Sequence, residues 1–174
     1  INFKFLINAA YAGLPGFLRQ IGCEPIKSKF ELCIMPILKI KQPEPQTGVT
    51  VMDGPFCSIM PKGFNKSEYI LYHVKHSVNQ KHIGYEKINW SYIDGDTERY
   101  IIDQCLEYYP ILEDTELIDS WITTRVVLPN CDSDDARPTL VLKNKKNIFS
   151  IFSGKITTCV DAASSVLDLI KHND

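Results

Sequence analysis

The order of apolar and polar positions predicts a chain that is rich in strands and ends on a helix. Runs of apolar, β-branched and aromatic residues predict strands, and Gly, Pro and Asp between them predict turns. Asp-Gly-Pro at 53–55 predicts a tight turn in an antiparallel sheet, and Pro36 predicts an edge strand or a bulge. The predicted strands cover Phe5 to Ala9, Phe30 to Ile40, Val49 to Met52, Phe56 to Met60, Tyr69 to Val74, Leu117 to Leu128, Thr139 to Leu142 and Ile148 to Phe152.

Three segments have helical periodicity. A short helix is predicted from Leu14 to Ile21, with Pro15 in its first turn and Gly22 at its end. A second is predicted from about Thr97 to Tyr109, where Pro110 stops it. The chain closes on a third helix after residues 153–155. Its expected buried stripe consists of Ala162, Ala163, Val166, Leu167 and Ile170.

Composition and charge narrow the class of protein. The 174 residues are 44% hydrophobic and 23% charged, which excludes disordered and fibrous classes. A net charge of -2 without a long basic run makes nucleic acid an unexpected partner. The apolar runs are too short for a transmembrane segment, and the opening residues do not resemble a signal peptide. Because the chain starts at Ile1, we expect it to be a piece of a larger one.

The cysteine and histidine spacings do not predict a metal site. The six cysteines form no C-x-x-C pair, so we expect reduced, mostly buried thiols and a cytoplasmic protein. His73 and His76 are three apart in a predicted strand, which would direct their side chains to opposite faces. Either histidine remains a candidate general base, although the catalytic residue is not identified.

Several segments, in their order along the chain, resemble one enzyme family. Phe152-Ser-Gly-Lys-Ile-Thr-Thr158 is similar to the Gly-Gly-Lys-Leu-Thr-Thr stretch of FAD-dependent glycerol-3-phosphate dehydrogenases, which belong to the D-amino-acid oxidase-like oxidoreductases. Trp121-Ile-Thr-Thr-Arg125 resembles the family's aromatic-x-Gly-x-Arg-Pro strand, and Leu6-Ile-Asn-Ala-Ala10 resembles its Val-Asn-Ala strand. Met52-Asp-Gly-Pro-Phe56 and Tyr69-Ile-Leu-Tyr-His-Val-Lys75 look like strands of its substrate domain.

The resemblance implies an α+β fold. Residues 26–116 would form the substrate-binding domain, an antiparallel or mixed sheet with helices. Residues 1–25 and 117–174, the two chain ends, would form a remnant of the FAD-binding α/β domain. No G-x-G-x-x-G fingerprint can be drawn from the nine glycines, so the N-terminal nucleotide-binding half would lie outside this chain.

The resemblance also implies the site residues. Arg125, Arg137 and Lys155 would hold a small anionic substrate. The turn at Ser153, Gly154, Lys155, Ile156, Thr157 and Thr158 would contact FAD, with helix N–H groups near the anionic edge of the reduced ring. Two departures bear on the substrate: Thr123 and Val126 replace the family's Gly and Pro around the strand arginine, and Val160 replaces an arginine common in the dehydrogenases. These departures put glycerol phosphate in doubt.

The same residues also permit interpretations in which they have a purely structural role. The turn can be a plain strand-to-helix connection capped by Thr157 or Thr158, and either arginine can form a structural salt bridge. The chain would then be a non-catalytic ligand-binding or interaction module. Under the first hypothesis the parent protein transfers a hydride from an amino acid, hydroxy acid or phosphorylated alcohol to FAD. This chain alone would be inactive and free of FAD.

Overall fold

The computed structural model describes residues 2–41, 47–52, 54, 56–63, 67–90, 96–129, 138–152 and 155–172. The chain divides into two compact units. Unit 1 comprises Ile1–Phe30, His82–Asn89 and Arg125–Asp174, and unit 2 comprises Glu31–Lys81 and Trp90–Thr124. The boundary between the units falls within three long strands, so the same strands contribute residues to both.

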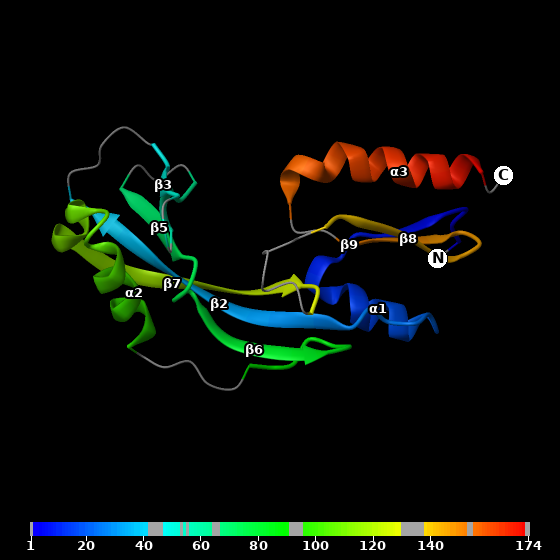
Figure 1. The fold of residues 1–174 in the computed structure, drawn as a ribbon, viewed down its shortest axis with the longest axis horizontal. Helices are drawn as coiled ribbons and strands as arrows, with labels where there is room; N and C mark the ends of the chain where they lie inside the picture. The colour runs from blue at the N-terminus through cyan, green and yellow to red at the C-terminus, as the bar shows by residue number, and fades with distance from the viewer. Residues whose placement is uncertain are drawn as a thin grey trace. The chain divides into compact units, whose positions relative to one another are not determined.

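Most of the described elements are strands (Figure 1). The strands are β1 (Leu6–Asn8), β2 (Ser28–Ile40), β3 (Val49–Val51), β4 (Cys57–Pro61), β5 (Glu68–His73), β6 (Val78–Gly84), β7 (Thr115–Val127), β8 (Leu140–Lys145) and β9 (Ile148–Phe152). The helices are η1 (Tyr11–Gly13), α1 (Leu14–Gln20), α2 (Thr97–Cys105), η2 (Pro110–Asp114), η3 (Ile156–Thr158) and α3 (Cys159–Lys171), where η marks a 3-10 helix.

Unit 1 joins the two ends of the chain in one sheet. Its strand order is β1-β9-β8, with β1 parallel to β9 and β8 antiparallel to it. The register pairs Leu6 with Ile148 and Asn8 with Ser150, so the first predicted strand lies directly beside the strand at Ile148 to Phe152. Parallel strands of this kind are normally covered on both faces, which fits the apolar character of β9.

Helix α3 packs along the sheet of unit 1 and contacts β8 (Figure 1). Ala162 and Val166 are buried in this contact, as predicted. The predicted stripe is wrong at Ala163, which is exposed, and at Leu167, which is 55% exposed. Among the described residues the sheet has three strands, and the row of α3 that carries Ala162 and Val166 is the one buried against it, so the adjacent apolar row remains uncovered.

Unit 2 is built on the larger sheet. The strand order is β3-β4-β5-β2-β6, and β7 also pairs with β2. Strands β3, β4, β5 and β2 are antiparallel neighbours, as the turn signals predict. Apolar side chains of this sheet meet α2 and η2 in one core. It consists of Leu38, Ile40, Cys57, Ile59, Tyr69, Leu71, Ile101, Cys105, Tyr109 and Leu112.

Two details of unit 2 differ from the prediction. The suggestion that Pro36 marks an edge strand is wrong, because β2 lies between β5 and β6. The proline is tolerated where pairing changes: Ile34 donates to the Ser77 carbonyl before it, and pairing with β5 begins after it at Ile37. Helix α2 ends at Cys105, four residues before the predicted end at Tyr109.

The mixture of helices with antiparallel and parallel strands confirms the predicted α+β class. Within the described residues, each helix is too short or too polar to cross a bilayer. Cys33, Cys57 and Cys105 are buried, Cys23 is half-buried and Cys159 is exposed, and all five are free thiols.

Candidate functional site

The candidate site lies at one edge of the unit 1 sheet. Because β1 and β9 are parallel and in register, their carboxyl ends meet at the same edge. The chain leaves this edge through η1 after β1 and towards η3 after β9. In sheets with parallel strands, ligands characteristically bind at the carboxyl ends. This edge is therefore the expected position of a ligand site in unit 1.

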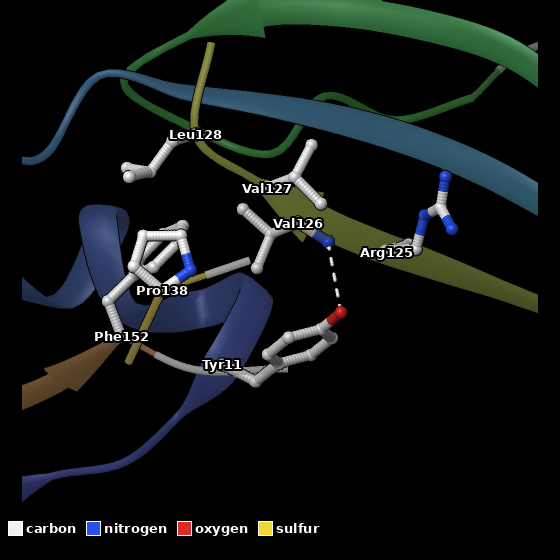
Figure 2. A pocket seen from close by; sticks show the side chains of 7 residues that line it. All are labelled: Tyr11, Arg125, Val126, Val127, Leu128, Pro138 and Phe152. Atoms are coloured by element: carbon white, nitrogen blue, oxygen red, sulfur yellow. Dashed lines mark hydrogen bonds between the residues drawn. The ribbon is translucent and has the colours of Figure 1, made fainter. Parts of the chain in front are cut away.

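A small cavity of about 40 Å³ opens at this edge. Figure 2 shows the side chains that line it, which come from η1, the end of β7 and the residue after it, the segment before β8 and the end of β9. They are Tyr11, Arg125, Val126, Val127, Leu128, Pro138 and Phe152. The sequence segments that carry the family resemblance near residues 10, 125 and 152 therefore converge in space. The cavity itself has room only for water-sized molecules, so a larger ligand could only lie against its rim.

Tyr11 is the most unusual residue of the cavity. Its backbone φ is 51°, in the left-handed region that a bulky residue rarely occupies. Its hydroxyl accepts a hydrogen bond from the backbone N–H of Val126 at 3.3 Å, drawn in Figure 2. The side chain thus ties η1 to the end of β7. Backbone conformations of this kind are often kept at functional sites.

Arg125 reaches the cavity but does not point into its apolar part. Figure 2 shows its guanidinium directed away from the side chains of Pro138 and Phe152. The residue is half-buried and has an interaction partner within the chain. An arginine side chain can fork two N–H donors towards a carboxylate or phosphate. This is the role that the family resemblance implies for Arg125, and it stays a prediction.

The start of α3 lies close to the same edge. Thr158 is the N-cap residue of α3, but its hydroxyl donates to the Lys155 carbonyl at 3.0 Å instead of capping a helix N–H. The hydroxyls of Thr158 and Thr139 lie 2.6 Å apart, which ties this turn to the segment before β8. Ile156 is 86% exposed, and Lys155 and Thr157 are also exposed. This first turn therefore offers an open surface beside β9.

Three of the predicted site residues, Arg137, Ser153 and Gly154, lie outside the described residues. Lys155 does not line the cavity with Arg125. Tyr11 was missed by sequence reasoning, because the small residues around it predict only a close-packed turn. The signal that could have found it is its position three residues after a strand end in the segment that resembles the family.

His73 and His76 lie in unit 2 and the expectation that they face opposite sides is wrong. Strand β5 ends at His73, so the turn that follows brings the two rings to a centroid distance of 4.4 Å. The ring of His76 also meets Tyr100 edge-on at 4.9 Å. Nδ1 of His73 accepts hydrogen bonds from the N–H groups of Lys75 and His76, at 3.2 and 3.3 Å.

The environment of these histidines favours their neutral form. Burial, followed by the charges of His76 and Lys75, lowers the pKa of His73. Burial and Lys75 lower the pKa of His76. Because Nδ1 of His73 already holds the turn, this nitrogen is occupied and the imidazole acts as a structural acceptor. His76 borders an open cavity of about 370 Å³ with Lys75, Asn79 and Tyr100.

Comparison with solved structures identifies the fold. The chain is similar to a glycine oxidase from Geobacillus kaustophilus, with a TM-score of 0.60 and 14% identity over 97% of this chain and 41% of that one. The glycerol-3-phosphate dehydrogenase from Bacillus halodurans, solved in complex with FAD, has a TM-score of 0.65 and 16% identity, over 99% of this chain and 32% of that one. An L-amino acid deaminase from Proteus vulgaris has a TM-score of 0.61 and 10% identity, over 100% of this chain and 40% of that one.

The chain thus spans about a third to two fifths of the length of these proteins. No protein-family model matches the sequence, and no curated protein matches it. At these identities the likeness concerns the fold. The chain shares the fold of a segment of these proteins, one of which was solved with FAD, and of an FAD dependent oxidoreductase from Pseudomonas aeruginosa, as its sequence motifs predict.

Proposed function

We propose that this chain is the substrate-domain and C-terminal part of an FAD-dependent oxidoreductase. Its substrate would be a small anionic amino acid, hydroxy acid or phosphorylated alcohol, oxidised by hydride transfer. One observation carries the proposal: the ends of β1, β7 and β9 converge on Tyr11, Arg125 and Phe152 within a fold shared with such enzymes. FAD, when bound, supplies the hydride acceptor.

The residues at this edge fit one wall of a flavin site. The cavity of about 40 Å³ is too small to enclose the ring, so the ring would lie against its rim. The turn from Ser153 to Thr158 would then face the pyrimidine edge, and the first N–H groups of the helix would favour negative charge there. The exposure of Lys155, Ile156 and Thr157 supports this part of the proposal, since a ligand could approach these residues from solvent.

The same edge would provide the cations for the substrate. Arg125 borders the cavity, and Arg137 and Lys155 are proposed beside it on the strength of the sequence resemblance. Their role would be to bind and orient a carboxylate or phosphate. A general base is not assigned: Nδ1 of His73 is occupied by two N–H donors, and His76 is the better of the two histidine candidates.

The proposed division of labour assigns residues 26–116 to substrate binding, and residues 1–25 and 117–174 to the FAD domain. The two compact units support it in outline, although residues 26–30 and 82–89 group with the chain ends and residues 117–124 group with unit 2. The proposed partner is an N-terminal nucleotide-binding half of the same parent protein. Exposed apolar side chains at Ile7 (47%), Val160 (70%) and Leu167 (55%) support such a partner, because it would cover them.

The test is flavin content with and without the segment that precedes this chain in its gene. We expect a G-x-G-x-x-G sequence in that segment, and yellow protein with about one flavin per chain when both parts are expressed together. The 174-residue chain alone should purify colourless, because it lacks the pyrophosphate anchor. A preceding segment without the fingerprint, and protein without flavin, would favour the non-catalytic module instead.

A further inference from the structure

Unit 2 contains a large open cavity that the proposed function does not use. Its volume is about 390 Å³, within the range of roughly 300–1,000 Å³ that is typical of small-molecule sites. It lies between one face of the sheet and the segment that follows α2. The residues that decide its character are Ile40, Val49, Ile59, Tyr69, Tyr109 and Ile111.

The register of the strands explains why these side chains share one face. Val49 on β3 is paired with Ile59 on β4, and Ile59 is paired with Leu71 on β5. Directly paired residues point to the same side of a sheet. Ile59, Tyr69 and Leu71 belong to the core beneath α2 and η2, so the floor of the cavity is continuous with that core.

The cavity has a buried floor and an apolar mouth. Ile59 and Tyr69 are 5% and 3% exposed, whereas Val49 and Ile111 are 46% and 38% exposed. Exposed aliphatic side chains that surround a buried apolar floor leave hydrophobic surface in contact with water. Covering this surface with an apolar ligand is favourable, because it removes that surface from water.

Tyr109 makes one wall rigid. Its hydroxyl lies 3.0 Å from the Val49 carbonyl oxygen and 2.9 Å from that of Cys57, to which it donates. The hydrogen bond to Cys57 and the close contact with the Val49 carbonyl fix the ring between β3, β4 and the segment after α2. A wall that is held before ligand arrives loses little conformational entropy on binding.

Two pairs of opposite charge adjoin the described lining residues of the cavity. Lys41, next to Ile40, lies 3.7 Å from a carboxylate oxygen of Asp114 on η2. Glu68, next to Tyr69, forms an ion pair of 3.2 Å with Lys62. The described lining residues are uncharged. A charged ligand would therefore lose its hydration without gaining a counter-charge at the walls.

We propose that this cavity is a binding site for a small neutral apolar molecule, aromatic or aliphatic, that fits within about 390 Å³. Its selectivity comes from shape and apolar contact with Ile59, Tyr69 and Tyr109. The hydroxyl of Tyr109 holds the site together rather than contacting the ligand.

Titration of the 174-residue chain with N-phenyl-1-naphthylamine, a neutral apolar fluorophore, tests the proposal. We expect saturable binding of one molecule per chain. Ile59→Phe fills the floor and should weaken binding by about tenfold or more. The matched control is Met60→Phe. Met60 is the next residue on β4, is 52% exposed and points to the other face of the sheet. The Met60→Phe variant should therefore bind the fluorophore with the affinity of wild type.

A second variant keeps the test decisive if Ile59→Phe fails to fold, as judged by circular dichroism. Ile111→Trp narrows the mouth from η2 and should also weaken binding while leaving the buried floor intact. Absence of saturable binding to wild type would overturn the proposal, as would equal affinity for wild type, Met60→Phe and Ile111→Trp. Binding that appears only on dissociation of a dimer, followed by sedimentation, would also overturn it, since a second copy would then be the occupant.

Discussion

The hydroxyl of Tyr11 accepts a hydrogen bond from the backbone N–H of Val126, across 115 positions of the sequence. The contact joins the turn after β1 to the end of β7 and holds Tyr11 at a φ of 51°. Val126 is 3% exposed, so water cannot readily replace this acceptor. The contact is the hydrogen bond drawn between residues that line the cavity in Figure 2.

Removal of this hydroxyl should destabilise the fold. In Tyr11→Phe the buried N–H of Val126 loses its acceptor, and we expect the free energy of unfolding to fall by about 1–3 kcal/mol. Urea unfolding followed by circular dichroism measures this change. Tyr85→Phe, at a tyrosine that is 44% exposed, should stay within about 0.5 kcal/mol of wild type. Equal effects of the two substitutions would show that the Tyr11 contact does not stabilise the protein.

The second prediction concerns Tyr109 at alkaline pH. Burial raises its pKa to about 12, from an ordinary value of 10. The folded state therefore keeps this proton where the unfolded state loses it, so stability is full below pH 10 and falls as the pH rises towards 12. Phenolate absorbance should show a late-titrating tyrosine that Tyr109→Phe removes. Tyr108→Phe, the adjacent half-buried tyrosine, is the control and should keep the late phase.

The third prediction concerns acid. The pKa values of His73 and His76 are lowered from 6.5, so the unfolded state binds more protons below that pH. Stability should consequently fall as the pH drops below about 6.5. His73→Asn keeps an acceptor for the turn and removes one titrating ring, so its stability should depend less on pH between 5 and 6.5. Urea midpoints across this range measure the slope, and an unchanged slope would contradict the assignment.

Helix α3 provides a fourth prediction at two neighbouring positions. Val166 is 2% exposed, and Val166→Ala should lower the free energy of unfolding by about 1–3 kcal/mol, since it removes buried methyl groups. Leu167 is 55% exposed, and Leu167→Ala should change the free energy of unfolding of the isolated chain by less than about 0.5 kcal/mol. In a flavin-containing assembly with the proposed N-terminal half, Leu167→Lys should reduce the yield of intact complex. The same yield as wild type would mean that this row of α3 stays open to solvent.

Much of the fold could be predicted from the sequence where a run of apolar residues is also buried in the folded protein. Strand β9 has the predicted bounds, because Ile148 to Phe152 is apolar and its strand is almost wholly buried. Strand β6 was not predicted, since Asn79, Gln80, Lys81 and His82 offer no alternation of apolar residues. Its pairing with β2 comes from the tertiary arrangement, which a local pattern cannot reveal.

The site was predictable in outline and not in detail. The family resemblance placed residues near 10, 125 and 152 in one fold, and they do line one cavity. The left-handed conformation of Tyr11 has no local signal, because a bulky residue rarely adopts it. The proximity of His73 to His76 depends on β5 ending at His73, and element boundaries are what periodicity predicts least well.

The most direct test of the central claim is reduction of bound flavin by substrate in the longer protein, without oxygen. Small amino acids, hydroxy acids and phosphorylated alcohols are added to wild type and to Arg125→Ala, and the loss of yellow absorbance is followed. We predict that an anionic substrate bleaches the wild-type flavin, and that Arg125→Ala lowers kcat/KM by a factor equivalent to about 2–4 kcal/mol while keeping its flavin. Arg19→Ala, which breaks an exposed ion pair with Glu86, should react like wild type. A flavin that no such substrate reduces, or equal kinetics of wild type and Arg125→Ala, would contradict the account.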